Sequence, residues 1–302
     1  MNGNANGNGV IADEEQPLLG RKPTPPSLLS KCRKQMTAEV SRSWADLVLL
    51  LCYVVTGLLD SASTQVWGAF VSMQTGTCMP SYNPHPRADM ASFIHTQSSQ
   101  RRRLTTVGNT VFVGLGIATI FNPPVSARLY KSGVSLLSFC VGSFFFARFH
   151  RYFSPKRRWV LCASFAAQAL LIVAAAVVVT VWPAPGDERA VGWTILVPLA
   201  LVAFQSCGQA VTSRALKYNA LTSVVLTSIY CDLFSDQDLF KVRNVERNRR
   251  AAAPALLLVG AVAGGLFSHS SFGIQGALWA AAGIKSIMVV LWFFWPTEDE
   301  ES

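Results

Sequence analysis

Six stretches of about twenty mostly apolar residues constrain this chain more than any other feature. A helix needs about 20 such residues to cross the hydrocarbon core of a bilayer. Only helices and closed barrels span lipid, because every backbone polar group must be paired there. The sequence therefore predicts an all-α fold, a polytopic integral membrane helical bundle, with spans at residues 43–63, 132–149, 159–182, 191–211, 251–267 and 274–295.

The composition agrees with this class. Of the 302 residues, 51% are hydrophobic and 14% are charged, whereas a soluble domain carries about 25% charged residues. The net charge of +9 is attributed to basic loops that set orientation, so the expected partner is the lipid bilayer and not nucleic acid. The seven cysteines include no C-x-x-C pair, which predicts no disulfide framework, no metal site and no other cofactor.

Polar sequence flanks the predicted membrane domain, residues 43–295. Residues 1–42 are rich in Asn, Gly and Pro and predict a disordered cytoplasmic tail, and residues 296–302 form an acidic C-terminal tail. Within the first tail, Glu14 precedes Leu18 and Leu19, which resembles an acidic dileucine sorting signal for endosomes, lysosomes or vacuoles. The alternative is an idle tail. A working signal requires this tail to face the cytosol.

Two shorter apolar stretches, residues 107–121 and 220–234, are either short spans or re-entrant segments. If neither crosses and the N-terminus is cytosolic, sixteen of the Lys and Arg residues from position 31 onward lie inside and seven outside. If both cross, the counts become twelve and eleven. Because cytoplasmic loops carry an excess of Lys and Arg, the first arrangement is favoured. It predicts both termini in the cytosol, with the protein in a vacuolar, endosomal or plasma membrane.

Each half of the chain runs long stretch, short stretch, long stretch, long stretch. Three spans per half is an odd number, so the second half would have the opposite orientation. Inverted repeats with interrupted helices are typical of secondary transporters, whose substrate site lies near the bilayer midplane. The hydropathy pattern thus predicts a possible 3+3 inverted repeat, although residue identity between the halves is poor.

Polar residues inside the apolar stretches are the candidate functional groups, because a charge at membrane depth is costly. Asp60 is either a coupling group that faces a cavity or a residue at the water boundary. Lys285 lies in the middle of its stretch and needs a partner, for which Asp60 and Asp232 are the candidates. It is either functional or part of a structural pair. Gln205, with Gln209 and Thr212 on the same helical face, either lines a cavity or bonds a neighbouring helix.

Gly57, Asp60, Ala62 and the later Thr75–Gly76 pair follow the pattern G-x-x-D-x-A … T-G. With the second-half segments around Gln205 and Thr227, they resemble the DUF1275 (YoaK-like) family of small multi-pass membrane proteins. The resemblance covers residues 44–295. It implies a membrane location and this fold, and no particular substrate, because the family has no established activity.

One departure from the family pattern is informative. The family reads T-G-N-T-V without a break, whereas residues 77–108 separate Gly76 from Asn109 here. Removal of this polar, basic insert restores Gln-Thr-Gly-Asn-Thr-Val. The insert is either a translated intron or a genuine extramembranous loop. A rejoined turn would place polar groups at membrane depth, where irregular backbone must be buried in protein or line a wet cavity.

The leading interpretation is a secondary transporter or permease-like carrier of a small solute, and the alternative is a non-transporting membrane protein that binds or scaffolds a partner. No spacing of nucleophile and base predicts an enzyme. Neither the solute nor an oligomeric state follows from the sequence. The predicted substrate- or ion-binding residues are Asp60, Gln74, Thr75, Gly76, Asn109, Gln205, Thr227 and Lys285.

Overall fold

The computed structural model describes residues 35–41, 45–74, 108–118, 120, 126–184, 190–218, 221–241 and 243–296. The sorting-signal residues Glu14, Leu18 and Leu19, almost all of the insert, and most of both tails lie outside these ranges. Within them, six helices are long and apolar enough to cross a membrane. They are α2 (Ala45–Trp67), α5 (Ala127–Phe153), α6 (Arg158–Val181), α7 (Trp193–Ala215), α9 (Val245–His269) and α10 (Gly273–Phe293).

The six predicted spans are confirmed, but four helices, α2, α5, α7 and α9, extend beyond them by four residues or more. Helix α5 begins five residues before its apolar stretch, and α9 begins six residues before its own. Both extensions contain Lys or Arg residues. The apolar pattern stops at these residues, but the backbone remains helical through them. Helix α2 continues to Trp67, so Asp60 lies two turns inside the helix. The interpretation of Asp60 as the boundary residue at a helix end is therefore wrong.

The helix contacts repeat between the two halves. Helix α2 packs on α9 as α7 packs on α5, and α6 packs on α7 as α10 packs on α2. The short helix α4 (Asn109–Ala118) packs on α5 as the short helix α8 (Leu226–Phe234) packs on α9, and α6 and α10 contact each other. Exchanging the halves converts each of these pairs into another contacting pair. This pairing is what the internal repeat predicts.

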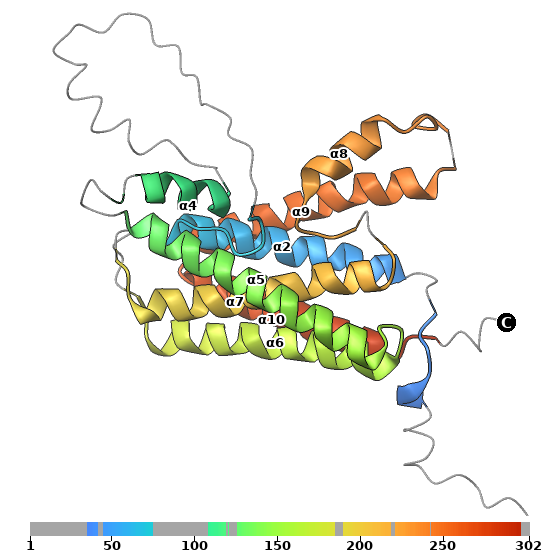
Figure 1. Cartoon of the computed structure of the whole chain (residues 1–302), viewed down its shortest axis with the longest axis horizontal. Helices are drawn as coiled ribbons and strands as arrows, with labels where there is room; N and C mark the ends of the chain where they lie inside the picture. The colour runs from blue at the N-terminus through green and yellow to red at the C-terminus, as the bar shows by residue number, and fades with distance from the viewer. Residues whose placement is uncertain are drawn as a thin grey trace, which may run out of the picture.

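The two halves run in opposite directions. Figure 1 shows that α2 and α7 cross the bundle in opposite senses and that α4 and α8 lie near opposite ends of it. Helices α2, α6, α7 and α10 supply most of the hydrophobic core. Helices α5 and α9 are the least buried of the six. The repeat is therefore inverted, with one outer helix from each half.

Both short apolar stretches follow a sharp reversal of the chain. Gly68 directly after α2 has φ +75°, and Lys217 shortly after α7 has φ +64°, the left-handed conformation that commonly ends a helix. After each reversal the chain returns beside the helix it has just left, and α4 or α8 begins there. Both stretches are therefore re-entrant in form. Residues 68–74 are called the first re-entrant segment below, and residues 216–218 with 221–225 the second.

Glycines bring the helix axes close together. A Cβ on Gly57 of α2 would collide with the Leu257 carbonyl oxygen of α9, and one on Gly260 or Gly264 would collide with carbonyl oxygens of α2. In the other half, Gly142 of α5 lies against the Phe204 carbonyl of α7. Small residues permit such close packing between membrane helices. The Gly260-x-x-x-Gly264 spacing is thus a packing motif.

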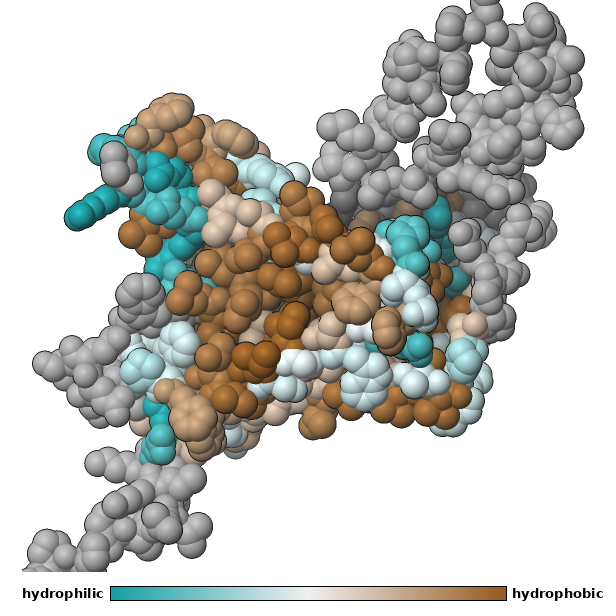
Figure 2. Space-filling model, turned by 180° about the vertical axis from the view of Figure 1, so that it is seen from behind, coloured by the Kyte–Doolittle hydropathy of each residue, from teal (hydrophilic) through white to brown (hydrophobic). Residues whose placement is uncertain are grey.

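Both described ends of the chain lie at the same end of the bundle. The Ser41 N–H donates to the Pro296 carbonyl, and the backbones of Glu39 and Arg157 form an isolated antiparallel β-bridge beside the α5–α6 turn. This arrangement is expected for an even number of crossings. On the face shown in Figure 2, apolar side chains cover the middle of the bundle, and hydrophilic ones gather toward its ends.

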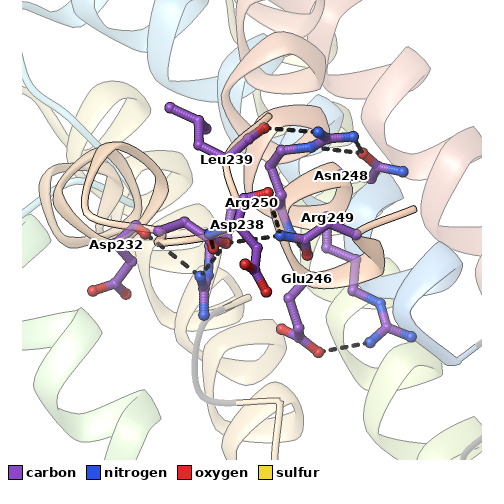
Figure 3. A network of polar contacts seen from close by, with 10 residues as sticks. Asp232, Asp238, Leu239, Glu246, Asn248, Arg249 and Arg250 are labelled. Carbon is purple, nitrogen blue, oxygen red and sulfur yellow. Dashed lines mark hydrogen bonds and ion pairs between the residues drawn. The ribbon is translucent and has the colours of Figure 1, made fainter. Parts of the chain in front are cut away.

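The connection from α8 to α9 is held by arginines at the start of α9 (Figure 3). Arg250 binds the Asp236 carboxylate at 3.3 Å, and Arg247 donates to the carbonyl oxygens of Leu239 and Lys241 at 2.7 and 2.6 Å. The neighbouring Arg249 binds Asp46 of α2 at 2.7 Å. The first bonds hold the α8–α9 hairpin (residues 226–250) together, and the Arg249–Asp46 ion pair ties it to α2.

Candidate functional site

Asp60 anchors the first re-entrant segment. One carboxylate oxygen accepts the N–H groups of Val71 and Ser72 at 2.8 Å each, and the other accepts that of Met73 at 3.1 Å. The side chain is buried. Hydrogen bonds to a charged group are about twice as strong as neutral ones, so this carboxylate holds the irregular backbone inside the bundle.

Gln74 and Asn109 come together although the insert separates them in the sequence. The Asn109 Nδ2 donates to Gln74 Oε1 at 2.9 Å, to the Phe70 carbonyl at 2.7 Å and to Ser135 Oγ at 3.0 Å. Asn109 Oδ1 accepts the Phe70 N–H at 3.2 Å. The sequence led us to expect this polar turn only for a chain without the insert, yet the two residues meet with the insert in place. Thr75 and Gly76 lie outside the described residues.

Lys285 is fully buried, and its partners are amides. Its Nζ donates to Gln168 Oε1 at 2.6 Å and to Gln209 Oε1 at 2.8 Å, and it lies 4.9 Å from the centre of the Phe165 ring. The expected pairing with Asp60 or Asp232 is wrong. Asp60 binds backbone N–H groups instead, and the exposed Asp232 touches Arg250 through its carbonyl.

Hydrogen bonds extend from Lys285 in two directions. Gln209 Nε2 donates to Thr56 Oγ1 at 2.5 Å and to Ser223 Oγ at 2.9 Å, which anchors the second re-entrant segment as Asp60 anchors the first. Ser223 has a positive φ of 58°, a strained conformation for a residue other than glycine. Both re-entrant segments are thus tied to the helix that precedes them.

The second direction leads to a histidine. Gln168 Nε2 donates to Ser164 Oγ at 3.3 Å, and Ser164 Oγ lies 3.2 Å from His150 Nε2. Thr212 Oγ1 is also 3.2 Å from His150 Nε2. A continuous hydrogen-bonded chain therefore connects Lys285 of α10 to His150 near the end of α5. Its members are buried.

A cavity of about 640 Å³ opens between α5, α7 and the two re-entrant segments. Along α5 it extends from Phe139 to Arg151, which is about 18 Å at the rise of a helix. It begins at the end of the bundle that holds both described termini and reaches the first re-entrant segment. Its described lining residues are Ser72, Gln74, Phe139, Ser143, Ala147, His150, Arg151, Pro155, Ala210, Val211, Arg214, Ala215, Val224 and Val225.

Two buried polar atoms of the cavity-lining residues have no hydrogen-bond partner among the described residues. They are the Ser72 hydroxyl oxygen and His150 Nδ1, and both residues are about 98% buried or more. An unsatisfied buried polar group costs about 1–3 kcal/mol. The cavity therefore offers hydrogen-bonding positions that water or a solute would satisfy.

The remaining predicted residues lie apart from this cavity or only near it. Gln205 is buried on α7, and its Oε1 has no partner among the described residues. Gln209 and Thr212, on the same face, bond to neighbouring helices. Thr227 is exposed on α8. Of the eight predicted residues, only Gln74 is among the described lining residues.

Sequence reasoning missed most of the cavity. The predicted span 132–149 stops short of His150 and Arg151, because the apolar stretch ends before them. A signal was present nonetheless: Phe139, Ser143, Ala147 and Arg151 recur every four residues and so share one helical face. Gln168 was also missed, although it is a polar residue at the same depth of its stretch as Lys285. In the described part of the chain, no three His, Cys, Asp or Glu side chains are grouped as metal ligands would be.

A comparison with known protein families identifies the family of this chain. No curated protein and no solved structure is significantly similar to it. The family model described as "Protein of unknown function (DUF1275)" matches residues 89–291. The match starts within the insert and includes five of the six spanning helices, so it is narrower than the resemblance seen in the sequence. This integral membrane protein belongs to the DUF1275 family.

Proposed function

We propose that this protein is a secondary carrier of a small solute and not an enzyme. The observation that carries the proposal is the cavity between α5 and α7, which ends at an irregular segment inside the bundle. Small-molecule sites are mostly apolar concavities with a few placed polar groups, and the lining has this character. The inverted repeat with two re-entrant segments is the architecture in which such carriers place their sites.

The proposal includes an orientation. The end of the bundle at which the cavity opens carries the α5–α6 turn, with Lys156 and Arg157, and the start of α9, with Arg247, Arg249 and Arg250. The positive-inside tendency favours the cytosol for this end, with both termini on the same side. A signal at Glu14, Leu18 and Leu19 would then be accessible to cytosolic sorting machinery for an endosomal or vacuolar membrane.

The polar residues divide between two roles in this proposal. Asp60 and Gln209 hold the re-entrant segments, and Lys285 joins Gln168 to Gln209. Ser72, Gln74 and His150 face the solute path. Substitution of Asp60 or Lys285 is therefore a poor test of transport, because a loss of folding would accompany any loss of flux. The cavity itself is the better target.

The test fills the cavity without touching its polar framework. Ala147 of α5 and Ala163 of α6 are both exposed alanines, but only Ala147 lines the cavity. We expect Ala147→Trp to reach normal abundance in the membrane and to lose function, and the matched control Ala163→Trp to retain it. The readout is an untargeted comparison of metabolites in cells that lack the protein and in cells that regain each form.

Two outcomes would contradict the carrier. In the first, no solute pool changes when the protein is removed. In the second, Ala147→Trp restores the changed pool as well as Ala163→Trp does. Either result favours the alternative, a membrane protein that scaffolds a partner and has no transport activity.

A further inference from the structure

The charged side chains that line the cavity are basic, which suits an anionic solute better than a neutral or cationic one. Arg151 of α5 and Arg214 of α7 line it together with His150, and none of the described lining residues is acidic. Neither arginine forms an ion pair with a described carboxylate, whereas Arg249 and Arg250 of the α8–α9 hairpin do. Two unneutralised guanidinium groups therefore stand at the mouth of one mostly apolar cavity.

We infer that the cavity binds a small organic anion with an apolar body and a carboxylate group. This inference rests on the proposed carrier function, for which it names the substrate class. Guanidinium groups bind carboxylates with paired hydrogen bonds. A cleft with charge of one sign also concentrates solutes of the opposite sign. Phe139, Val211 and Val224 supply the apolar wall.

The unpaired polar atoms of the lining complement this ligand. Ser72 Oγ, at the inner end of the cavity, has no partner among the described residues and can bind a water or a second polar group of the ligand. Thr212 Oγ1 lies 2.8 Å from the Gly208 carbonyl and donates its proton there, whereas the Ser164 hydroxyl can either donate to His150 Nε2 or accept from it. In either tautomer His150 Nδ1 is left to pair with a water or a polar group that accompanies the anion. No new buried charge on the protein is needed.

Arginines at the end of a helix also serve to orient membrane proteins, and a control must separate this role from binding. Arg148 provides it, because it lies on α5 one turn before Arg151 and stacks on the Phe144 ring at 5.1 Å. It lines an aromatic groove with Phe145 and Tyr152 and does not line the cavity, whereas Arg151 borders both. Loss of Arg148 removes the same charge, from the end of α5 instead of the end of α7.

The test measures binding of three probes to the full-length protein in nanodiscs by calorimetry. The probes are benzoate, benzamide and benzylamine, which share a ring and differ in charge. We expect benzoate to bind at least tenfold more tightly than the other two. Arg214→Gln should weaken benzoate binding by about tenfold or more, the loss expected for a hydrogen bond to a charged group. Arg148→Gln should change it less than twofold.

Any other result contradicts either the anion site or the proposed carrier function. Preference for benzamide or benzylamine, absence of binding by all three probes, or equal effects of Arg148→Gln and Arg214→Gln overturns the anion site. Proteoliposomes then separate this inference from the proposed function. Specific benzoate binding without any benzoate counterflow leaves the anion site standing and removes the carrier. Counterflow of a cationic or neutral solute, without benzoate, retains the carrier and removes the anion site.

Discussion

The backbone N–H of Thr110 donates a 3.0 Å hydrogen bond to the carbonyl oxygen of Gln74, from which it is separated by 36 positions in the sequence. The two sides of the insert therefore meet inside the bundle. If residues 77–108 were absent, Thr110 would become the fourth residue after Gln74, and this bond would have the spacing of an α-helix. Helix α4 would then continue from the first re-entrant segment without a break.

We therefore expect a variant that lacks residues 77–108 to fold and to be at least as stable as the full chain. Closing a shorter loop costs less entropy, which favours the variant by roughly 2 kcal/mol. The measurement is the thermal unfolding midpoint of the purified protein in detergent. A variant that aggregates or melts well below the full chain would show that the insert is an integral loop. A spliced transcript without these codons would identify it as an intron.

Asp60→Asn should lower stability strongly. An asparagine has one acceptor oxygen, and its amide group would point toward N–H groups that now donate to the carboxylate. Each hydrogen bond to a charged group contributes about 1.5–3 kcal/mol. We expect a clearly lower unfolding midpoint and lower abundance, whereas Asp46→Asn, which loses one ion pair near the helix end, should have a smaller effect. Equal effects of the two changes would contradict the anchoring role.

Lys285 and Gln168 should be energetically coupled. Lys285→Met leaves Gln168 Oε1 without its donor, and Gln168→Leu leaves the buried ammonium group with one acceptor fewer. The double variant avoids part of both penalties. Residues in direct contact show interaction energies of about 0.5–3 kcal/mol. The sum of the decreases in unfolding midpoint caused by the two single variants should therefore exceed the decrease caused by the double variant. Additive effects would mean that the contact contributes little.

Bulk at Gly260 should separate α2 from α9. The Cβ of Gly260→Ala would collide with the Val54 carbonyl oxygen, whereas the Cβ of Gly283→Ala in α10 meets nothing within 4 Å. Alanine is favoured over glycine in a helix by roughly 0.5–1 kcal/mol. We expect the first change to lower the unfolding midpoint and the second to leave it unchanged or raise it. The opposite order would show that this helix contact is loose.

The α8–α9 hairpin should loosen in acid. The Asp238 N–H, together with Asn244 and Arg250, holds the pKa of Asp236 below its ordinary value. A carboxyl group with a lowered pKa stabilises the folded state above the unfolded-state pKa of about 3.9. That stabilisation is lost as the pH falls through the lower folded-state pKa. Hydrogen exchange of residues 235–250, corrected for the intrinsic pH dependence, should rise below about pH 4.

The matched variant for this measurement is Asp236→Asn. Its hairpin should already exchange faster at neutral pH, and its exchange should vary less with pH than that of the parent chain. A parent hairpin whose protection is unaffected by acid would contradict the role of this carboxylate.

The sequence predicted the spans because their signal is local: about twenty apolar residues suffice to identify a membrane helix. The interrupted motif indicated that Gln74 and Asn109 would form one turn if the insert were removed, but it did not predict that they meet with the insert in place. It did not predict the partners of Lys285. The partner of a buried charge depends on how helices that are distant in sequence pack, and here two amides replaced the expected carboxylates.

The cavity was harder still to predict. Its arginines lie where hydropathy falls and a helix is expected to end, and a helix that continues into a basic segment carries no apolar signal. Ser72 lies in irregular backbone, whose path is set by the Asp60 carboxylate and not by any local preference of residues 70–74. Only the three-dimensional contacts bring Ser72, His150 and Arg214 to one wall.

The exchange of outer helices between the halves has a consequence for assembly. Helix α5 rests on α7, and α9 rests on α2, so each half completes its packing with a helix of the other. A chain severed between α6 and α7 would yield two fragments that need one another, and expression of both together should rebuild the bundle. A single half of this design, standing alone, would have to pair with an antiparallel copy of itself.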